Sequence, residues 1–497
     1  MSETGPAFPE ELLLGMFQHL EAPHELRSIL ATSRQFARIA HPLAFSAFTV
    51  AFHGYDEVPG VSYYETLALV MGNLKQKMDF FLSARTAPGV RSCVMTLRDG
   101  RQDGGSDPQY QTYPLLDYLL TRIGSFSGLR SLRVYGLALS SSVLPSIQGL
   151  RQLRSLDLEG CIIYHPRKIE PLRPHLGPSS VEILRISRQQ SPLVQSAAWT
   201  SFISPHRLVE LSAPLLSHTS GWWSTLLAEV HVLPRLSKLV LFGHCEGRHN
   251  ETPAIVASKF PAVQELRFLV NYANFEARVA GALCSITTVR RLVAPLGAVS
   301  RTALSTLPLT HYSCRLPEFL QRDHSSESIL QHLSPSSTLT SLALFLDDIS
   351  LTSLTRILGM FPHLVHFRLD FHDYDVDEDE DEDEDPPCPF SVDALIWGRL
   401  RDVLPPNLSA LAIAAHDMYG VTSWPRQLNE TELAALRNGY LARFPDLAML
   451  YLHGEDFLVS RDLRGPEGNV DIAVSSSSTN ERSHANLDTV WDNMWRQ

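Results

Sequence analysis

Histidine is the residue type that most invites a search for chemistry, because the chain carries 20 histidines. His363, His366 and His372 fall close together, but their spacing along a strand alternates badly for a shared metal ion. The chain has no His-Glu-x-x-His, Gly-x-x-x-x-Gly-Lys or Gly-x-Gly-x-x-Gly motif. Gly124 to Gly128 has the glycine spacing of a nucleophile elbow, but Phe126 occupies the serine position. We therefore expect no catalysis by this polypeptide, no metal site and no cofactor, and we interpret His363, His366 and His372 as surface residues.

Cysteines and carboxylates give no metal-binding pattern either. The six cysteines are far apart and form no Cys-x-x-Cys, which indicates neither a disulfide framework nor a zinc site. Nine carboxylates run without interruption from Asp377 to Asp385, but the block lacks the glycine and the spacing of a calcium-binding loop. Mutual repulsion predicts an extended, disordered insertion at about 373–387, with attraction of a basic partner as the alternative.

Composition narrows the class of protein further. The net charge of −12 falls to about −3 without the acidic block, and no basic stripe interleaved with aromatic residues is present. This argues against nucleic acid as a principal ligand. The chain begins without the features of a signal peptide, and no run approaches about 18 consecutive apolar residues. We expect a protein that does not enter a membrane and that resides in the cytoplasm, the nucleus or both.

A repeated apolar pattern runs through most of the chain, and the structure that it predicts must position any binding surface. The pattern apolar-x-x-apolar-x-apolar begins at Leu129, Leu153, Val181, Leu208, Leu236, Val263, Val289, Leu339, Leu364, Leu408 and Leu447, with a degenerate copy near Leu309. The first seven starts are 24 to 28 residues apart. This length and motif are typical of a leucine-rich repeat, and Cys161 falls where that consensus places Asn or Cys. We predict an α/β fold: a curved solenoid with parallel strands on its concave face and helices or irregular returns outside.

The strand positions that alternate with the buried ones predict a binding surface. Mixed charges with scattered aromatic residues suit a protein or peptide ligand, although an ordinary solvated face is the alternative for any single residue. The candidate target-binding residues are Arg133, Tyr135, Asp157, Arg185, Lys238, Phe242, Arg267, Arg291, His366, Arg368 and Tyr451.

The end of the chain combines a polar stretch with a short apolar stripe. We expect residues from Gly465 to about Ala485 to be mobile. A terminal helix is predicted because its apolar residues recur at helical spacing, namely Leu487, Val490, Trp491, Met494 and Trp495. Two interpretations stay open: the helix shields the last repeat, or it binds a partner.

Residues 8 to 45 predict three short helices that are too small to bury a core alone. The pattern is Phe8-Pro9-x-Glu11-Leu12-Leu13-x-x-Met16-Phe17-x-x-Leu20, followed by Leu26-x-x-Ile29-Leu30-x-x-Ser33-Arg34-x-Phe36-x-x-Ile39-Ala40-x-Pro42-Leu43. It resembles the F-box of fungal F-box proteins, whose degenerate leucine-rich repeats the later pattern also resembles. Two departures are visible, since Phe8 precedes the proline where Leu is usual and Phe36 or Phe45 stands where Trp is common.

The resemblance implies a function in protein recruitment. In that family the three helices dock on a Skp-type adaptor, which bridges to a cullin and its ubiquitin-loading machinery. It implies that the chain is the receptor subunit of such a ligase, with the repeat face holding an unknown protein target. The implied adaptor-binding residues are Phe8, Pro9, Leu12, Leu13, Phe17, Leu20, Leu26 and Leu30.

The expected domains are an F-box at 1–45, the solenoid at 46–457 and a polar tail with a short helix at 458–497. Two alternatives stay open. The chain could be an F-box scaffold that acts outside ubiquitin transfer, or the first helices could merely cap the repeats.

Overall fold

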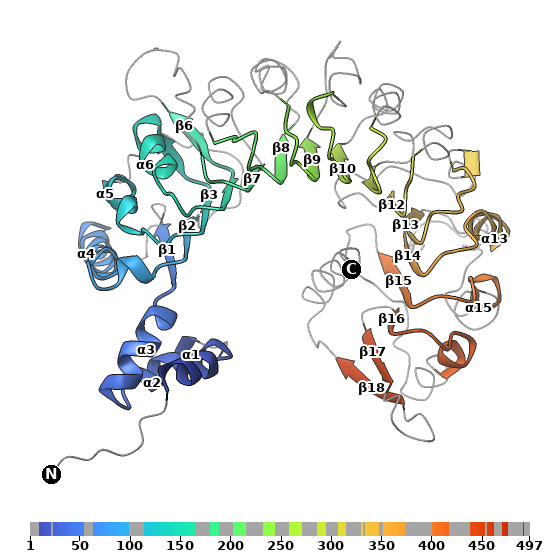
Figure 1. Ribbon diagram of the computed structural model, residues 1–497, viewed down its shortest axis with the longest axis horizontal. Helices are drawn as coiled ribbons and strands as arrows, with labels where there is room; N and C mark the ends of the chain where they lie inside the picture. The colour runs from blue at the N-terminus through green and yellow to red at the C-terminus, as the bar shows by residue number, and fades with distance from the viewer. Residues whose placement is uncertain are drawn as a thin grey trace, which may run out of the picture. The chain divides into compact units, whose positions relative to one another are not determined.

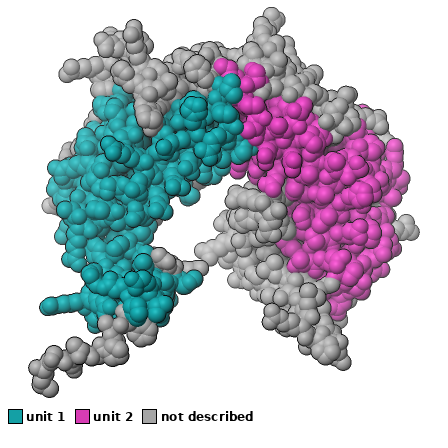
Figure 2. Space-filling view, in the orientation of Figure 1, with its two compact units in different colours: residues 1–237, 246–248 teal, residues 238–245, 249–497 magenta. Residues whose placement is uncertain are grey.

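A computed structural model gives the fold of the 497-residue chain. It describes residues 9–20, 23–53, 63–98, 114–164, 179–187, 202–214, 232–243, 258–270, 286–294, 307–314, 330–331, 333–346, 351–372, 400–416, 438–452, 455–461, 470–475 and 491. The chain forms two compact units, coloured separately in Figure 2. Unit 1 comprises 1–237 with 246–248, and unit 2 comprises 238–245 with 249–497.

Unit 1 begins with a small helical head. The head consists of α1 (Glu10–Gln18), α2 (Pro23–Leu30) and α3 (Arg34–Ala44). Pro9 precedes α1, whose first turn carries Glu10 and Glu11 where carboxylates meet the positive end of the helix. Ser33 caps α3, because its side chain accepts a hydrogen bond from the backbone N–H of Phe36 at 3.1 Å.

The rest of unit 1 is a stack of parallel strands with helices between them (Figure 1). In spatial order the strands are β1 (Ala47–His53), β2 (Ser92–Arg98), β3 (Ser131–Tyr135), β5 (Ser155–Glu159), β7 (Ile183–Ser187) and β8 (Glu210–Pro214). A second sheet pairs β4 (Ala138–Ser140) with β6 (Ile162–Tyr164). The helices are α4 (Tyr63–Phe81), η1 (Ala87–Gly89), α5 (Pro114–Arg122), η2 (Ile123–Ser125), η3 (Ser141–Val143) and α6 (Leu144–Gln148).

Unit 2 continues the same construction. Its parallel strands are β9 (Lys238–Gly243), β10 (Glu265–Val270), β11 (Arg291–Val293), β12 (His311–Ser313), β13 (Ser341–Leu346), β14 (His366–His372), β15 (Ala410–His416) and β16 (Met449–Leu452). Helix α13 (Leu351–Gly359) precedes β14, and α15 (Leu400–Val403) precedes β15. The pattern of one short strand per repeat, each paired in parallel with the next, is a leucine-rich-repeat solenoid, as predicted.

The sequence pattern locates the strands closely. Each of the twelve strands from β3 to β16 that lie in the main sheet begins two residues after a predicted repeat start, including β12 in the degenerate copy. The apolar positions of the pattern are the buried ones: Leu132, Leu156 and Leu184 are adjacent in register and fully buried. Each such side chain contributes about 1.5 to 3 kcal/mol when it leaves water, so the repeats are held together mainly by this stacking.

Polar side chains at the turns connect one repeat to the previous one. The Ser237 hydroxyl donates to the Val209 carbonyl at 3.3 Å, and the Thr338 hydroxyl donates to the Leu309 carbonyl at 2.8 Å. The Cys161 thiol donates to the Val134 carbonyl at 3.2 Å, and burial raises its pKa to about 12. Cys161 therefore has the structural role that the repeat consensus gives to Asn or Cys.

After β16 the sheet changes direction. Strand β17 (Glu455–Arg461) pairs antiparallel with β16, and β18 (Val470–Ser475) pairs antiparallel with β17. The prediction of a mobile stretch from Gly465 is therefore wrong for residues 470–475. The alternation of Val470, Ile472 and Val474 with other residues was a strand signal in the sequence. The acidic insertion lies outside the described residues.

Candidate interaction surfaces

The helical head has a small core of its own. Its buried residues are Leu13, Phe17, Leu26, Ile39 and Ala40. Leu20 and Leu30 are partly buried against them. Because Leu13, Phe17 and Leu26 point inward, they hold the three helices together. The expectation that these three side chains contact a partner directly is therefore corrected: their contribution is to the shape of the head.

A different strip of α1 is exposed. Leu12 is 58% exposed and Met16 is 60% exposed, although both are large apolar residues. They are four residues apart and so share one face of the helix. Pro9 is also exposed, whereas Phe8 lies outside the described residues. The apolar pattern of α1 predicted a wide apolar face, and the structure divides it into a buried strip and the Leu12–Met16 strip.

The head is joined firmly to the first repeat. Phe45 at the end of α3 contacts Phe80 and Phe81 of α4, with ring centroids 5.0 Å and 6.0 Å apart. Phe81 also packs on Phe48 of β1 at 4.5 Å. The Ser46 carbonyl accepts hydrogen bonds from the backbone N–H groups of Arg91 and Ser92, at 2.7 Å and 3.0 Å. These contacts give the head a fixed position on the first strands of unit 1.

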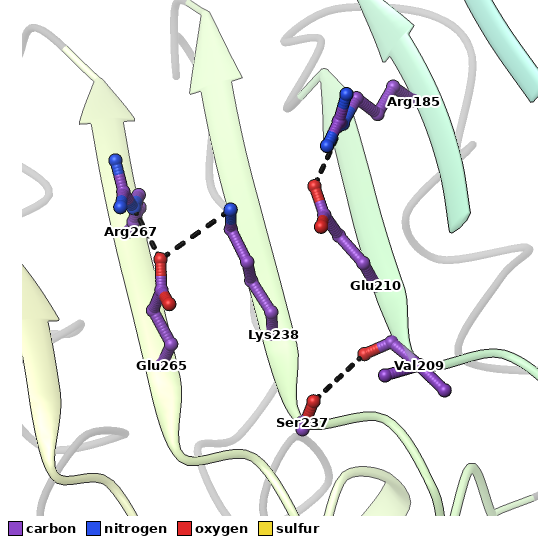
Figure 3. Close-up of polar contacts among 7 residues, drawn as sticks. All are labelled: Arg185, Val209, Glu210, Ser237, Lys238, Glu265 and Arg267. Atoms are coloured by element: carbon purple, nitrogen blue, oxygen red, sulfur yellow. Dashed lines mark hydrogen bonds and ion pairs between the residues drawn. The ribbon is translucent and has the colours of Figure 1, made fainter. Parts of the chain in front are cut away.

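In unit 1 the strand face opposite the core carries charges of both signs. Arg133, Asp157 and Arg185 are adjacent in register on β3, β5 and β7. The Arg185 Nε donates to Glu210 Oε1 at 2.8 Å (Figure 3). Burial raises the pKa of Asp157, and the flanking Arg185 and Arg133 oppose that shift. Arg133 is exposed, while Tyr135, Asp157 and Arg185 are half-buried. All four predicted residues thus lie on one face of the sheet.

In unit 2 the first repeats carry more positive charge than negative. Glu265 Oε1 lies 2.6 Å from Arg267 Nε and 3.6 Å from Lys238 Nζ, so one carboxylate interacts with two cations (Figure 3). Arg291 follows on β11, opposite Glu265 in the register. The four side chains are half-buried. Of the other predicted residues, Phe242 pairs in register with Leu269 and Tyr451 with Ala412.

Two histidines continue this face. His311 on β12 and His366 on β14 flank Ser341 in the register, with ring centroids 6.5 Å apart. Burial, then Arg291 and then His366 lower the pKa of His311 to about 4, and burial lowers the pKa of His366. Both rings are therefore neutral at pH 7. The interpretation of His366 as an ordinary surface residue is corrected, because it is half-buried.

Arg368 differs most from its predicted environment. It was expected on an exposed face, but it is 2% exposed, and its partner Asp370 is fully buried. Arg368 Nε donates to Asp370 Oδ2 at 2.7 Å, and Nη2 donates to Oδ1 at 3.2 Å. The strand face is the predicted one, because Arg368 is adjacent in register to Ala343 and Ala412. Arg368 and Asp370 are nevertheless shielded from solvent, because this part of the strand face is covered.

Trp491 is buried in the same cluster as Ala343 and Ala412, the register neighbours of Arg368. It is 3% exposed and belongs to one buried cluster with Val293, Ala343, Ala410, Ala412 and Met449. Trp491, from the predicted terminal segment, therefore lies at the strand face of unit 2. Trp491 is helical, as expected, while the other four residues of the predicted stripe lie outside the described residues.

The described residues contain neither a candidate metal site nor a membrane-spanning helix. Within the described part of the chain, no group of three or more His, Cys, Asp or Glu side chains could hold a metal ion. None of the helices in these residues is long and apolar enough to cross a bilayer.

Comparisons with known proteins find similarity in structure only. No protein-family model matches the chain, and no curated protein matches its sequence. An internalin (inlF) of Listeria monocytogenes is 13% identical with a TM-score of 0.34, covering 73% of this chain and 92% of its own. Rad7 and Elc1 in complex, from yeast, give 12% identity and a TM-score of 0.32, covering 74% and 93%. A TLR13–ssRNA13 complex gives 14% and 0.31, covering 75% and 41%.

Proposed function

We propose that this chain is a non-catalytic interaction protein that acts as the target receptor of a Skp-cullin-F-box type ubiquitin ligase. Its head would bind a Skp-type adaptor, and the strand face of its repeats would bind a target protein. Residence in the cytoplasm, the nucleus or both is part of this proposal.

The observation that carries the proposal is the exposed Leu12–Met16 strip on a small head that is fixed to a repeat stack. Large apolar side chains at this level of exposure favour a protein partner, because docking removes them from water. The head has few buried residues, so a partner that covers α1 also adds to its stability.

The strand face supports the second half of the proposal. It offers arginines, carboxylates and aromatic residues along successive strands, a composition that suits a protein ligand. A receptor of this kind needs no bond-making residue, since it acts by holding a target near the transferring enzyme. The firm junction at Phe45 supports such a role, because it fixes the distance between the head and the first strands.

The adaptor interaction can be tested with matched substitutions on α1. Leu12→Asp with Met16→Asp should weaken binding of a purified Skp-type adaptor by about 100-fold, because two apolar contacts are worth about 3 kcal/mol or more. Val232→Asp is the control, since Val232 is a similarly exposed apolar residue of unit 1 outside the head. Isothermal titration calorimetry measures both. Unchanged affinity in the double variant, with circular dichroism showing a folded chain, would refute adaptor docking through this strip.

A second function uses the same surfaces. An F-box scaffold outside ubiquitin transfer would bind the adaptor but not a cullin. Affinity purification of the full chain separates the two, because a ligase receptor retains neddylated cullin together with the adaptor. Adaptor without cullin would favour the scaffold.

A further inference from the structure

Strand β1 is the end strand of the main sheet in unit 1. Among the described strands it pairs with β2 alone, so one of its two edges is open. The strand is seven residues long, and residues 47–52 carry no charge and include Phe48, Val50 and Phe52, which favour strands. A long, uncharged end strand presents backbone N–H and C=O groups that can pair with a strand of another chain.

Hydrogen bonds at the start of β1 show which backbone groups face the open edge. The Ser46 carbonyl accepts hydrogen bonds from the backbone N–H groups of Arg91 and Ser92, so it faces β2. The direction of the backbone groups alternates along a strand, so every second residue from Ser46 also faces β2. The residues between them face the open edge, namely Ala47, Thr49 and Ala51.

A lysine of α4 occupies this edge. Lys77 Nζ donates to the Thr49 carbonyl at 2.7 Å and lies 6.0 Å from the centroid of the Phe48 ring. Lys77 forms no ion pair with any described residue, whereas Lys75 on the same helix pairs with Asp79 at 2.8 Å. The Lys77 ammonium is therefore directed at a carbonyl group that an added strand would use.

The sequence of β1 suits pairing with an identical strand. A two-fold axis brings two copies of one strand together antiparallel, and such an assembly closes at two chains. Because residues 47–52 are uncharged, the paired strands would place no like charges opposite each other. The two Lys77 side chains oppose the pairing, since each would have to leave its Thr49 carbonyl and the two ammonium groups would repel each other.

We propose that the open edge of β1 is a pairing surface for a second copy of this chain, and that Lys77 keeps this surface closed in the single chain. A lysine on an end strand is one of the ways in which proteins prevent edge-to-edge association. The inference is independent of the proposed function, because neither the Leu12–Met16 strip nor the charged residues of the strand face take part in it.

Sedimentation equilibrium of the full chain tests the proposal. Lys77→Met keeps the length of the side chain but removes the donor and the charge. Each copy gives up one hydrogen bond to Lys77 on pairing, and a hydrogen bond is worth about fivefold in an equilibrium constant. With two copies, Lys77→Met should lower the dissociation constant of the dimer by about 10- to 100-fold. Lys75→Met is the matched control and should behave as the wild-type chain.

Two additions to Lys77→Met locate the surface. Ala51→Pro removes an N–H group that faces the open edge but no hydrogen bond to β2, so it should return the chain to a monomer. Thr49→Cys should allow a short bifunctional maleimide to link two copies of the Lys77→Met chain. Arg133→Cys should not allow it, because Arg133 lies on β3, inside the sheet.

A folded Lys77→Met chain with the dissociation constant of the wild type would overturn the inference. So would species larger than a dimer, or a dimer that persists with Ala51→Pro, because another surface would then be responsible. Circular dichroism and the melting temperature establish folding, and Lys77→Ala repeats the measurement if Lys77→Met is not folded. Loss of folding in both variants would also overturn the inference, since Lys77 would then be required by the single chain itself.

Discussion

The buried Arg368–Asp370 pair gives the sharpest prediction about unit 2. The two side chains are 2% and 0% exposed and share two hydrogen bonds, of 2.7 Å and 3.2 Å. Replacing Arg368 with Met removes the guanidinium that donates both of these hydrogen bonds to the buried carboxylate. Removing one member of such a pair costs about 3 to 5 kcal/mol. We expect Arg368→Met to reduce the free energy of unfolding by this amount.

Two further variants show whether burial is the cause. Arg368→Met combined with Asp370→Leu removes both charges, so its free energy of unfolding should return to within about 2 kcal/mol of the wild-type value. In W491A the pair gains access to water, and the cost of Arg368→Met should fall to the range of about 0 to 1 kcal/mol for exposed pairs.

Urea unfolding followed by circular dichroism measures these differences, with the slopes compared between variants. A cost below about 1 kcal/mol for Arg368→Met in the wild-type background would refute the reasoning, since it would mean that water reaches the pair. A cost that is the same with and without Trp491 would refute the role of Trp491 in covering it.

Three other predictions concern the repeats, the histidines and the acidic block. Leu156→Ala should lower the free energy of unfolding by about 2 to 5 kcal/mol, because it opens a cavity between repeats. Arg133→Ala, at an exposed position, should be nearly neutral in thermal unfolding. Equal melting temperatures of the two variants would mean that Leu156 does not face the core. His311 has a lowered pKa in the folded chain, so its stabilising contribution is complete above about pH 6.5 and is lost as the pH falls toward 4. Allowing for its partial exposure, we expect a loss of about 1 kcal/mol between pH 7 and pH 5, absent in His311→Gln, as read from urea midpoints. Deleting residues 377–385 should leave the melting temperature unchanged, and a large decrease would show that the block packs against the repeats.

The positions of the repeats could be predicted from the sequence because each strand carries its own signal. An apolar triplet buries its side chains against the same triplet of the next repeat, as Leu132, Leu156 and Leu184 do. This signal is local and periodic, so even the degenerate copy at His311–Ser313 follows it. The alternation also assigns Arg133, Asp157 and Arg185 to one face correctly.

Exposure could not be predicted in the same way, because it depends on segments that are distant in the sequence. The sequence pattern predicts the correct strand face for Arg368 but the wrong exposure. Arg368 is buried, and Trp491, which is buried near it, lies far along the chain. In the head, the apolar pattern of α1 does not show which strip meets α2 and α3. Leu13 and Leu12 are adjacent in sequence, yet one is buried and the other exposed.

The sequence nevertheless contained one indication that this strand face of unit 2 is covered. A solvated strand face has no reason to carry Ala343 on β13 and both Ala410 and Ala412 on β15, because alanine neither favours strands nor attracts water. Such residues become favourable when a bulky group lies on them, as Trp491 does here. The same reasoning applies to Arg368 and Asp370, which form a pair between neighbouring positions of one strand face and so need no partner from solvent. Small residues, and charged residues that pair with each other, therefore indicate that a strand face of a repeat protein is covered at that point. What such a face can bind then depends on which segment covers it.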